Sequence, residues 1–213
     1  EFRINSIQTG LDMGSLLTQD STGEINDLLL DVVGSITGRI SARNMSRVDI
    51  GVDNIITQLR ISGDMRASAI VAGRLPSVTI DGDLTASQIT IAGALDNLTV
   101  GDSIVNSAIS VNGPFGKIVK LVAKNNISGS ISSSGPITSI EATNGDIDAA
   151  ITTLGVNSNV ASIKAGRDAI LDTDIAGTVD SIVAGRHIGQ KGRPGAVVIR
   201  GTLKEATAGG ALY

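Results

Sequence analysis

The chain has 213 residues, a net charge of −4 at pH 7 and no Cys or Trp. The lack of a basic excess argues against nucleic acid as a partner, and the lack of Cys excludes disulfides and thiolate metal sites. Hydrophobic residues make up 41% of the chain, too many for a disordered protein, whereas no apolar run reaches the roughly 18 residues that a membrane span requires.

Few side chains are suited to catalysis or to ring stacking. Phe2, Phe115 and Tyr213 are the only aromatic residues, so bases and sugars would find almost no aromatic platform. A Ser-His-Asp site would have to use His187, the single histidine, which we interpret as a surface corner residue. A polysaccharide-active enzyme is therefore the least favoured alternative: we expect no enzyme activity, no catalytic residue and no cofactor.

Taken in chain order, the sequence is built from one recurring unit of six residues, apolar-x-Ser-apolar-x-apolar. A partial copy, Ile4-Asn5-Ser6-Ile7, stands near the start. An insertion is expected at about residues 17–30, where Ile25 to Leu30 could form a turn or two of helix. From Val33 onward units begin at residues 33, 56, 75, 95, 118, 137, 160 and 179, which gives spacings of 19 to 23 residues. The repeat reaches about Ile199, and residues 204–213 are predicted to be a flexible or docking tail.

The apolar positions of the unit predict columns of stacked core residues. Short β-branched stretches separated by Gly, Asp and Asn favour strands over helices. The predicted core columns contain Ile56, Leu59, Leu75, Val78, Leu95, Leu98, Ile118, Leu121, Ile137, Ile140, Val160, Ile163, Val179 and Ile182.

This periodicity predicts one all-β domain over residues 1–203, a single-stranded parallel β-helix (β-solenoid). We expect about eight or nine triangular coils of 19–23 residues, right-handed by analogy with parallel crossovers. A β-sandwich is the competing architecture, but its strands do not need the same residue in the same slot of every repeat.

A polar residue precedes an apolar one at a second corner of each coil, as in Gly82-Asp83-Leu84. Successive residues of this slot are Asp64, Asp83, Ser103, Asn126, Asp146 and His187. Stacked carboxylates could hold cations, which makes Asp64, Asp83 and Asp146 weak metal candidates. The alternative, which we favour, is that the Asp and Asn side chains bond the backbone at a tight corner.

Several stretches resemble the G-S-I-T/G-D-L repeats of bacterial extracellular surface proteins, which are abundant in planctomycete-type bacteria. They are Gly34-Ser35-Ile36-Thr37-Gly38, Gly82-Asp83-Leu84-Thr85-Ala86-Ser87 and Ser181-Ile182-Val183-Ala184-Gly185. The 19-residue spacing is also similar to that of filamentous-haemagglutinin-like adhesins. The resemblance implies a structural role outside the cell or on its surface, and it carries no catalytic residue.

The two ends of the repeat show no amphipathic cap, although solenoids normally cap their ends. Uncovered coils expose unpaired backbone that can pair with further strands. We therefore expect a fibre or surface-layer building block that assembles head to tail with copies of itself. The alternative is a stalk segment of a larger adhesin, in which neighbouring segments of the same chain cover the ends. The predicted end residues are Ile4, Ile7, Val197, Val198 and Ile199.

Overall fold

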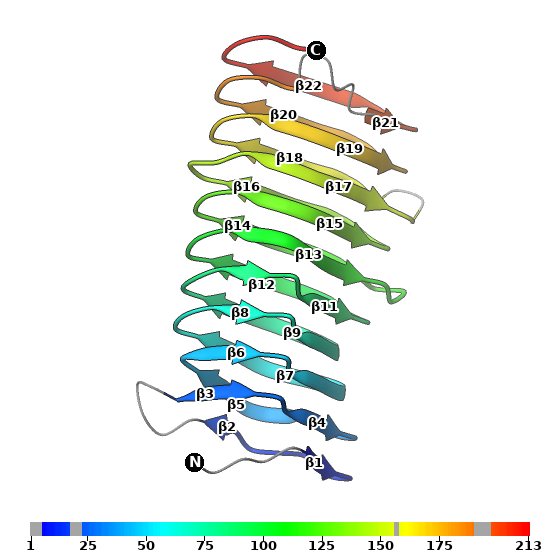
Figure 1. Ribbon diagram of the computed structural model, residues 1–213. Coiled ribbons are helices and arrows are strands. Elements are labelled where there is room, and N and C mark those ends of the chain that lie inside the picture. Colours follow the sequence, from blue (N-terminus) through cyan, green and yellow to red (C-terminus); the bar gives the residue numbers. More distant parts are fainter. Residues whose placement is uncertain (1–5, 18–22, 156–157, 190–196) are drawn as a thin grey trace.

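The computed structural model describes residues 6–17, 23–155, 158–189 and 197–213. Within these ranges the chain forms strands and no helix, and the strands wind into a β-solenoid of about nine turns (Figure 1). Strands pair in parallel with the equivalent strands one turn before and one turn after, as β12 does with β9 and β14. The predicted parallel β-helix is thus confirmed, and the β-sandwich is excluded.

Each turn consists of three short segments, which we call the first, second and third faces. The first face contains β3 (Glu24–Asn26), β6 (Asn44–Ser46), β8 (Met65–Arg66) and β10 (Leu84–Thr85). The second face contains β1 (Ser6–Thr9), β4 (Leu29–Val32), β11 (Gln88–Ile91) and β21 (Val197–Ile199). Four strands cover both of these faces: β13 (Ile104–Val111), β15 (Ile127–Ser133), β17 (Ile147–Thr153) and β19 (Ala169–Ile175).

The third face carries the six-residue unit. It contains β2 (Leu16–Leu17), β5 (Ile36–Ala42), β12 (Ala94–Val100), β14 (Lys117–Ala123), β16 (Ile137–Ala142), β18 (Val160–Ala165), β20 (Val179–Ala184) and β22 (Leu203–Ala208). In two turns the second and third faces are one continuous strand, β7 (Asp49–Ile61) and β9 (Ala69–Ile80).

Inward columns of Ile, Leu and Val fill the interior. All fourteen predicted core residues are buried, with at most 2% of their surface exposed. They stack in register from coil to coil, as Leu98 does between Val78 and Leu121. Each layer therefore removes apolar surface of the layers above and below from water. This burial stabilises the fold by about 25 cal/mol for each Å² of apolar surface.

The predicted N-terminal units are wrong in register. Ile36, and not Val33, aligns with Ile56, and Val33 is 55% exposed. Ile7 belongs to β1 on the second face, where it pairs with Leu30, so the segment around it is no copy of the third-face unit. Ile4 lies outside the described residues.

The predicted insertion at residues 17–30 extends too far. Residues 24–26 and 29–32 are the regular strands β3 and β4, which pair with β6 and β7, and no helical turn forms there. The alternating burial of β4 explains this, because Leu30 and Val32 point inward while Leu29 and Asp31 point outward. A helix would break this alternation.

The predicted C-terminal tail is also part of the solenoid. Residues 203–208 form β22, which pairs in parallel with β20, and Leu212 bridges to Ile188 on the first face. The side chains of β22 are exposed because no described layer lies above them, so the strand has a mostly polar sequence. This polar sequence lacks the apolar pattern from which the other strands were predicted.

The corner between the first and second faces has two forms. In five successive turns it is occupied by a left-handed residue, Asp27, Arg47, Ala67, Ala86 or Asn106, with φ between 47° and 54°. A buried serine follows this residue in three of the turns, and Ser87 Oγ accepts the Ser68 N–H at 3.2 Å. From Gly129 onward each turn has one residue fewer at this corner, and β17 and β19 run through it without a break.

At the left-handed corner we expect glycine to stabilise the protein, whereas glycine within a strand usually destabilises it. We expect Ala86→Gly to raise the free energy of unfolding by about 1 kcal/mol, because glycine adopts positive φ without the steric cost that alanine incurs. The matched control is Ala150→Gly in the straight strand β17, which we expect to lower that free energy by about 0.5–1 kcal/mol. Urea unfolding of both variants measures the effect, and a destabilised Ala86→Gly variant would contradict the strain argument.

Candidate functional site

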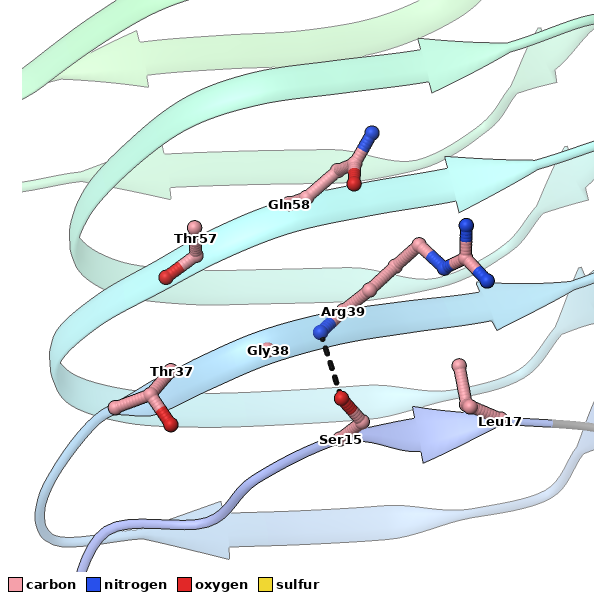
Figure 2. Close-up of a pocket in the computed structure, with 7 residues that line it drawn as sticks. All are labelled: Ser15, Leu17, Thr37, Gly38, Arg39, Thr57 and Gln58. Carbon is pink, nitrogen blue, oxygen red and sulfur yellow. Dashed lines mark hydrogen bonds between the residues drawn. The ribbon is translucent and has the colours of Figure 1, made fainter.

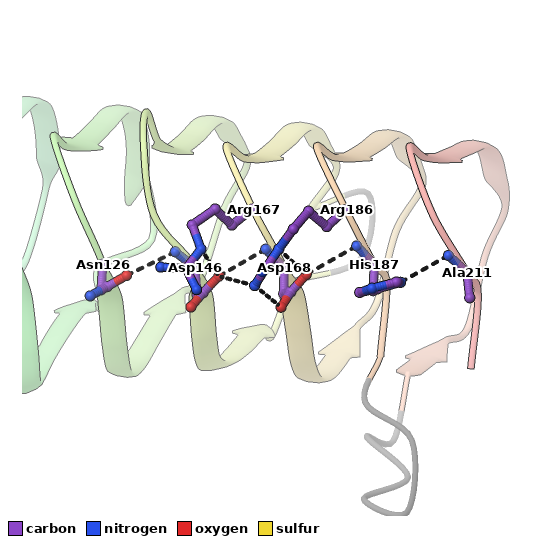
Figure 3. Close-up of polar contacts among 7 residues, drawn as sticks. All are labelled: Asn126, Asp146, Arg167, Asp168, Arg186, His187 and Ala211. Atoms are coloured by element: carbon purple, nitrogen blue, oxygen red, sulfur yellow. Dashed lines mark hydrogen bonds and ion pairs between the residues drawn. The ribbon is translucent and has the colours of Figure 1, made fainter.

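One corner of the solenoid carries a continuous ladder of hydrogen bonds between successive coils. The polar residue that precedes the first inward residue of the first face accepts the backbone N–H of the equivalent residue one turn later. Asp64 Oδ1, for example, accepts the Asp83 N–H at 2.9 Å. Figure 3 shows the C-terminal half of this polar ladder. Its members are Asn44, Asp64, Asp83, Ser103, Asn126, Asp146, Asp168 and His187, and the last bond reaches the Ala211 N–H.

The ladder explains the recurring Gly-Asp pair. A Cβ at Gly82 would lie 2.1 Å from Asp64 Oδ1 and 2.8 Å from the Gly63 carbonyl oxygen. A side chain there would collide with the ladder acceptor of the preceding coil, so glycine allows the coils to approach closely.

Cations neutralise part of the ladder's charge at the surface. Arg186 Nη2 lies 2.6 Å from Asp168 Oδ2, and Arg167 Nε lies 3.5 Å from Asp146 Oδ1 (Figure 3). Next to the N-terminal end of the ladder, hydrogen bonds from Asn44 and Asn26 lower the pKa of Glu24. The exposed ion pairs of Arg167 and Arg186 each contribute little to stability, since side-chain entropy and solvent screening offset their attraction.

The three metal candidates are bound to backbone. Asp64, Asp83 and Asp146 each accept an N–H of the next coil through Oδ1 at 2.9–3.0 Å. In the described part of the chain no three His, Cys, Asp or Glu side chains are arranged to hold a metal ion. The contacts thus support the backbone-bonding alternative, with one difference: the partner is about one turn away in sequence and not within the same corner.

The slot pattern in the sequence missed two members of the ladder, Asn44 and Asp168. Arg43 precedes Asn44 and Arg167 precedes Asp168, so neither residue stands in a Gly-Asp pair. Ala169 is also a weak apolar marker after Asp168. The spacing of about 20 residues along the slot was the signal that could have found them.

The described end coils have strand edges paired on one side only. At the start β1 pairs with β4 and β2 with β5, whereas at the end β21 pairs with β19 and β22 with β20. Among the predicted end residues, Ile7 and Ile199 are partly buried against the core, and Val197 and Val198 lie in β21. Leu203 and Leu212 are 41% and 62% exposed at the C-terminal end.

An open hollow of about 400 Å³ lies on the third face over β2, β5 and β7 (Figure 2). It is lined by Ser15, Leu17, Thr37, Gly38, Arg39, Thr57 and Gln58, and Ser15 Oγ accepts the Arg39 backbone N–H at 3.0 Å. These residues offer hydroxyl, amide and guanidinium groups but neither a carboxylate nor an imidazole. They therefore lack an acid–base pair for hydrolysis.

Removing one ladder acceptor should destabilise the protein measurably. We expect Asn126→Ala to lower the free energy of unfolding by about 1 kcal/mol, because the Asp146 N–H loses its acceptor. Asn126→Asp is the matched control, since Asp occupies the same slot at residues 64, 83 and 146 and keeps an oxygen in place. Chemical unfolding of the two variants tests this, and equal losses in both would show that the bond itself is not what matters.

Comparison with protein-family models, with curated proteins and with solved structures finds no match to this chain. The described residues also contain no helix long and apolar enough to cross a membrane. The features of the described chain that bear on its function are the polar ladder, the two end coils and the surface of the solenoid.

Proposed function

We propose that the chain is a structural element that stacks head to tail with copies of itself into an extracellular or cell-surface fibre or layer. The observation that carries the proposal is the complementarity of its two described ends. The polar side chains of the ladder support a structural role, since they bind backbone of neighbouring coils. The extracellular location rests on the resemblance of the repeats to those of bacterial surface proteins.

The first and last described segments are placed so that a stacked second copy would continue the order of the three faces. The first described strand, β1, lies on the second face, and the last described segment, around Leu212, lies on the first face. The next position along the solenoid is again the second face, which is where β1 of a second copy would be placed. A copy set on the C-terminal end would thus continue the winding without a missing or duplicated strand.

The inward columns also continue across this contact. Extending the observed register by one layer places Thr9 of the added copy over Ile199 on the second face. On the third face Met13 comes over Leu203 and Leu16 over Ala206. Apolar side chains would cover Leu203, and the open edges of β21 and β22 would gain partners.

Disulfide trapping tests both the contact and its register. In the outward third-face column Leu17 of one copy would lie over Thr207 of another, one strand spacing of about 4.8 Å away, within the Cα range of disulfides. Since the chain contains no Cys, only the two introduced thiols of Leu17→Cys/Thr207→Cys can form disulfides. We expect oxidation to give a ladder of covalent oligomers on denaturing gels and extended fibres by electron microscopy.

Two further variants serve as controls. Leu17→Cys/Lys164→Cys places the second thiol in the same column, but β18 is paired on both sides, so we expect no ladder. Adding Ala206→Glu to the first pair puts a charge on the exposed end of β22, where only a stacked copy would bury it. We expect that variant to fold but not to cross-link. Equal cross-linking in all three variants, or none in the first, would overturn the proposal.

A further inference from the structure

The last bond of the polar ladder differs chemically from the others. His187 Nδ1 accepts the Ala211 N–H at 2.9 Å, whereas the preceding acceptors are oxygens of Asn, Asp and Ser side chains. Nδ1 and Asn Oδ1 are both two bonds from Cβ, so neutral imidazole can take the place of an amide at this position. Imidazole is, however, the side chain whose charge ordinarily changes between about pH 5 and pH 8.

The residues after β22, Gly209–Tyr213, are held on the preceding coil mainly by backbone hydrogen bonds, and we call them the terminal segment. Besides the Nδ1 bond, its backbone bonds are those of Gly209 N–H to Ala184, Gly210 N–H to Arg186, Ile188 N–H to Ala211 and Tyr213 N–H to Ile188. The Tyr213 ring centroid lies 5.6 Å from that of His187, and Tyr213 is 61% exposed. Figure 3 shows the imidazole between the Asp168 rung and Ala211.

Protonation would reverse the role of Nδ1. The protonated ring carries N–H groups on both nitrogens, so Nδ1–H would face the Ala211 N–H, donor against donor. The coil below already uses Asp168, whose Oδ1 accepts the His187 backbone N–H and whose carboxylate pairs with Arg186. Arg167 pairs with Asp146, and Tyr213 supplies the facing hydroxyl-bearing ring. None of these contacts replaces the acceptor that Ala211 loses.

We propose that His187 is a pH-sensitive latch, which holds the terminal segment on the solenoid when neutral and releases it when protonated. The proton and the Ala211 N–H compete for the same lone pair of Nδ1, so protonation of the ring weakens the docking of the terminal segment. Release would expose the first-face edge at Ile188. The latch acts within a single chain, because His187 and Ala211 belong to the same molecule, and it is therefore independent of the proposed stacking.

Amide hydrogen exchange resolved by NMR tests the latch, on dilute protein carrying Ala206→Glu so that stacking does not contribute. We expect the protection factor of the Ala211 amide to fall roughly tenfold between pH 7.5 and pH 5.5. The amide of Ile163, in β18 with a paired strand on either side, should keep its protection and so exclude global unfolding. His187 and Tyr213 are the only residues of their types, so their ring signals report on the site without ambiguity.

Two substitutions separate the latch from a general effect of acid. His187→Asn keeps an acceptor of the kind found at Asn126, and we expect Ala211 to stay protected at both pH values. His187→Ala removes the acceptor, and we expect low protection at both. The proposal would be overturned if the protein that retains His187 kept the protection of the Ala211 amide at pH 5.5. It would also be overturned if His187→Asn lost as much protection at that pH as the protein with His187.

Discussion

Parallel backbone pairing between successive coils is the constraint on which the rest of the structure depends. Each strand in the interior of the stack has partners on both of its edges, so a shift in one coil would unpair two neighbours and move inward side chains outward. Once that register is fixed, equivalent residues must lie directly above one another. The inward columns, the buried serines and the polar ladder all follow from this alignment, because a residue that suits one layer suits the next. The corners obey the same condition as the strands. Backbone N–H groups at a corner need acceptors, and the ladder residues provide them from the coil below.

The corner between the first and second faces shows that the alignment tolerates a change in local shape. The N-terminal turns use a left-handed residue followed by a buried serine, whereas the C-terminal turns omit one residue and continue as a strand. Gly129 stands at the transition, with φ of 118° opposite Ser107. A side chain at Gly129 would lie within 2.2 Å of the Ser107 carbonyl oxygen, so glycine is required where the two corner forms meet.

Between Ile56 and Ile182 the third face could be predicted from the sequence to the residue, because its inward positions recur as Ile, Leu and Val and pack against each other. The second and first faces were harder to locate, because their inward columns change from Ile to Thr and Ala, as at Thr173 and Ala169. The errors near both ends have a common cause. Ile7 has the letters of the third-face unit but lies on another face, and β22 lacks the apolar pattern since no described layer covers it.

The candidate site was predictable in composition but not in connectivity. The sequence placed Asp64, Asp83 and Asp146 in one column, and their spacing indicated a shared structural role. It could not indicate that each side chain bonds a neighbour about 20 residues away, since an Asx turn within one corner uses the same residue types. The special position of His187 depends on Ala211, which lies in a segment with no recognisable repeat, so only the fold brings these two residues together.

The two forms of the corner carry a consequence for how such a chain changes over evolutionary time. Coils interact with their immediate neighbours, and the corner sequence has already changed by one residue part of the way along without disturbing the stack. Contacts between neighbouring coils do not fix the total number of coils, because each layer contacts only the layers beside it. Duplication or deletion of one turn of coding sequence would therefore lengthen or shorten the rod by about 4.8 Å while every remaining layer kept a compatible neighbour.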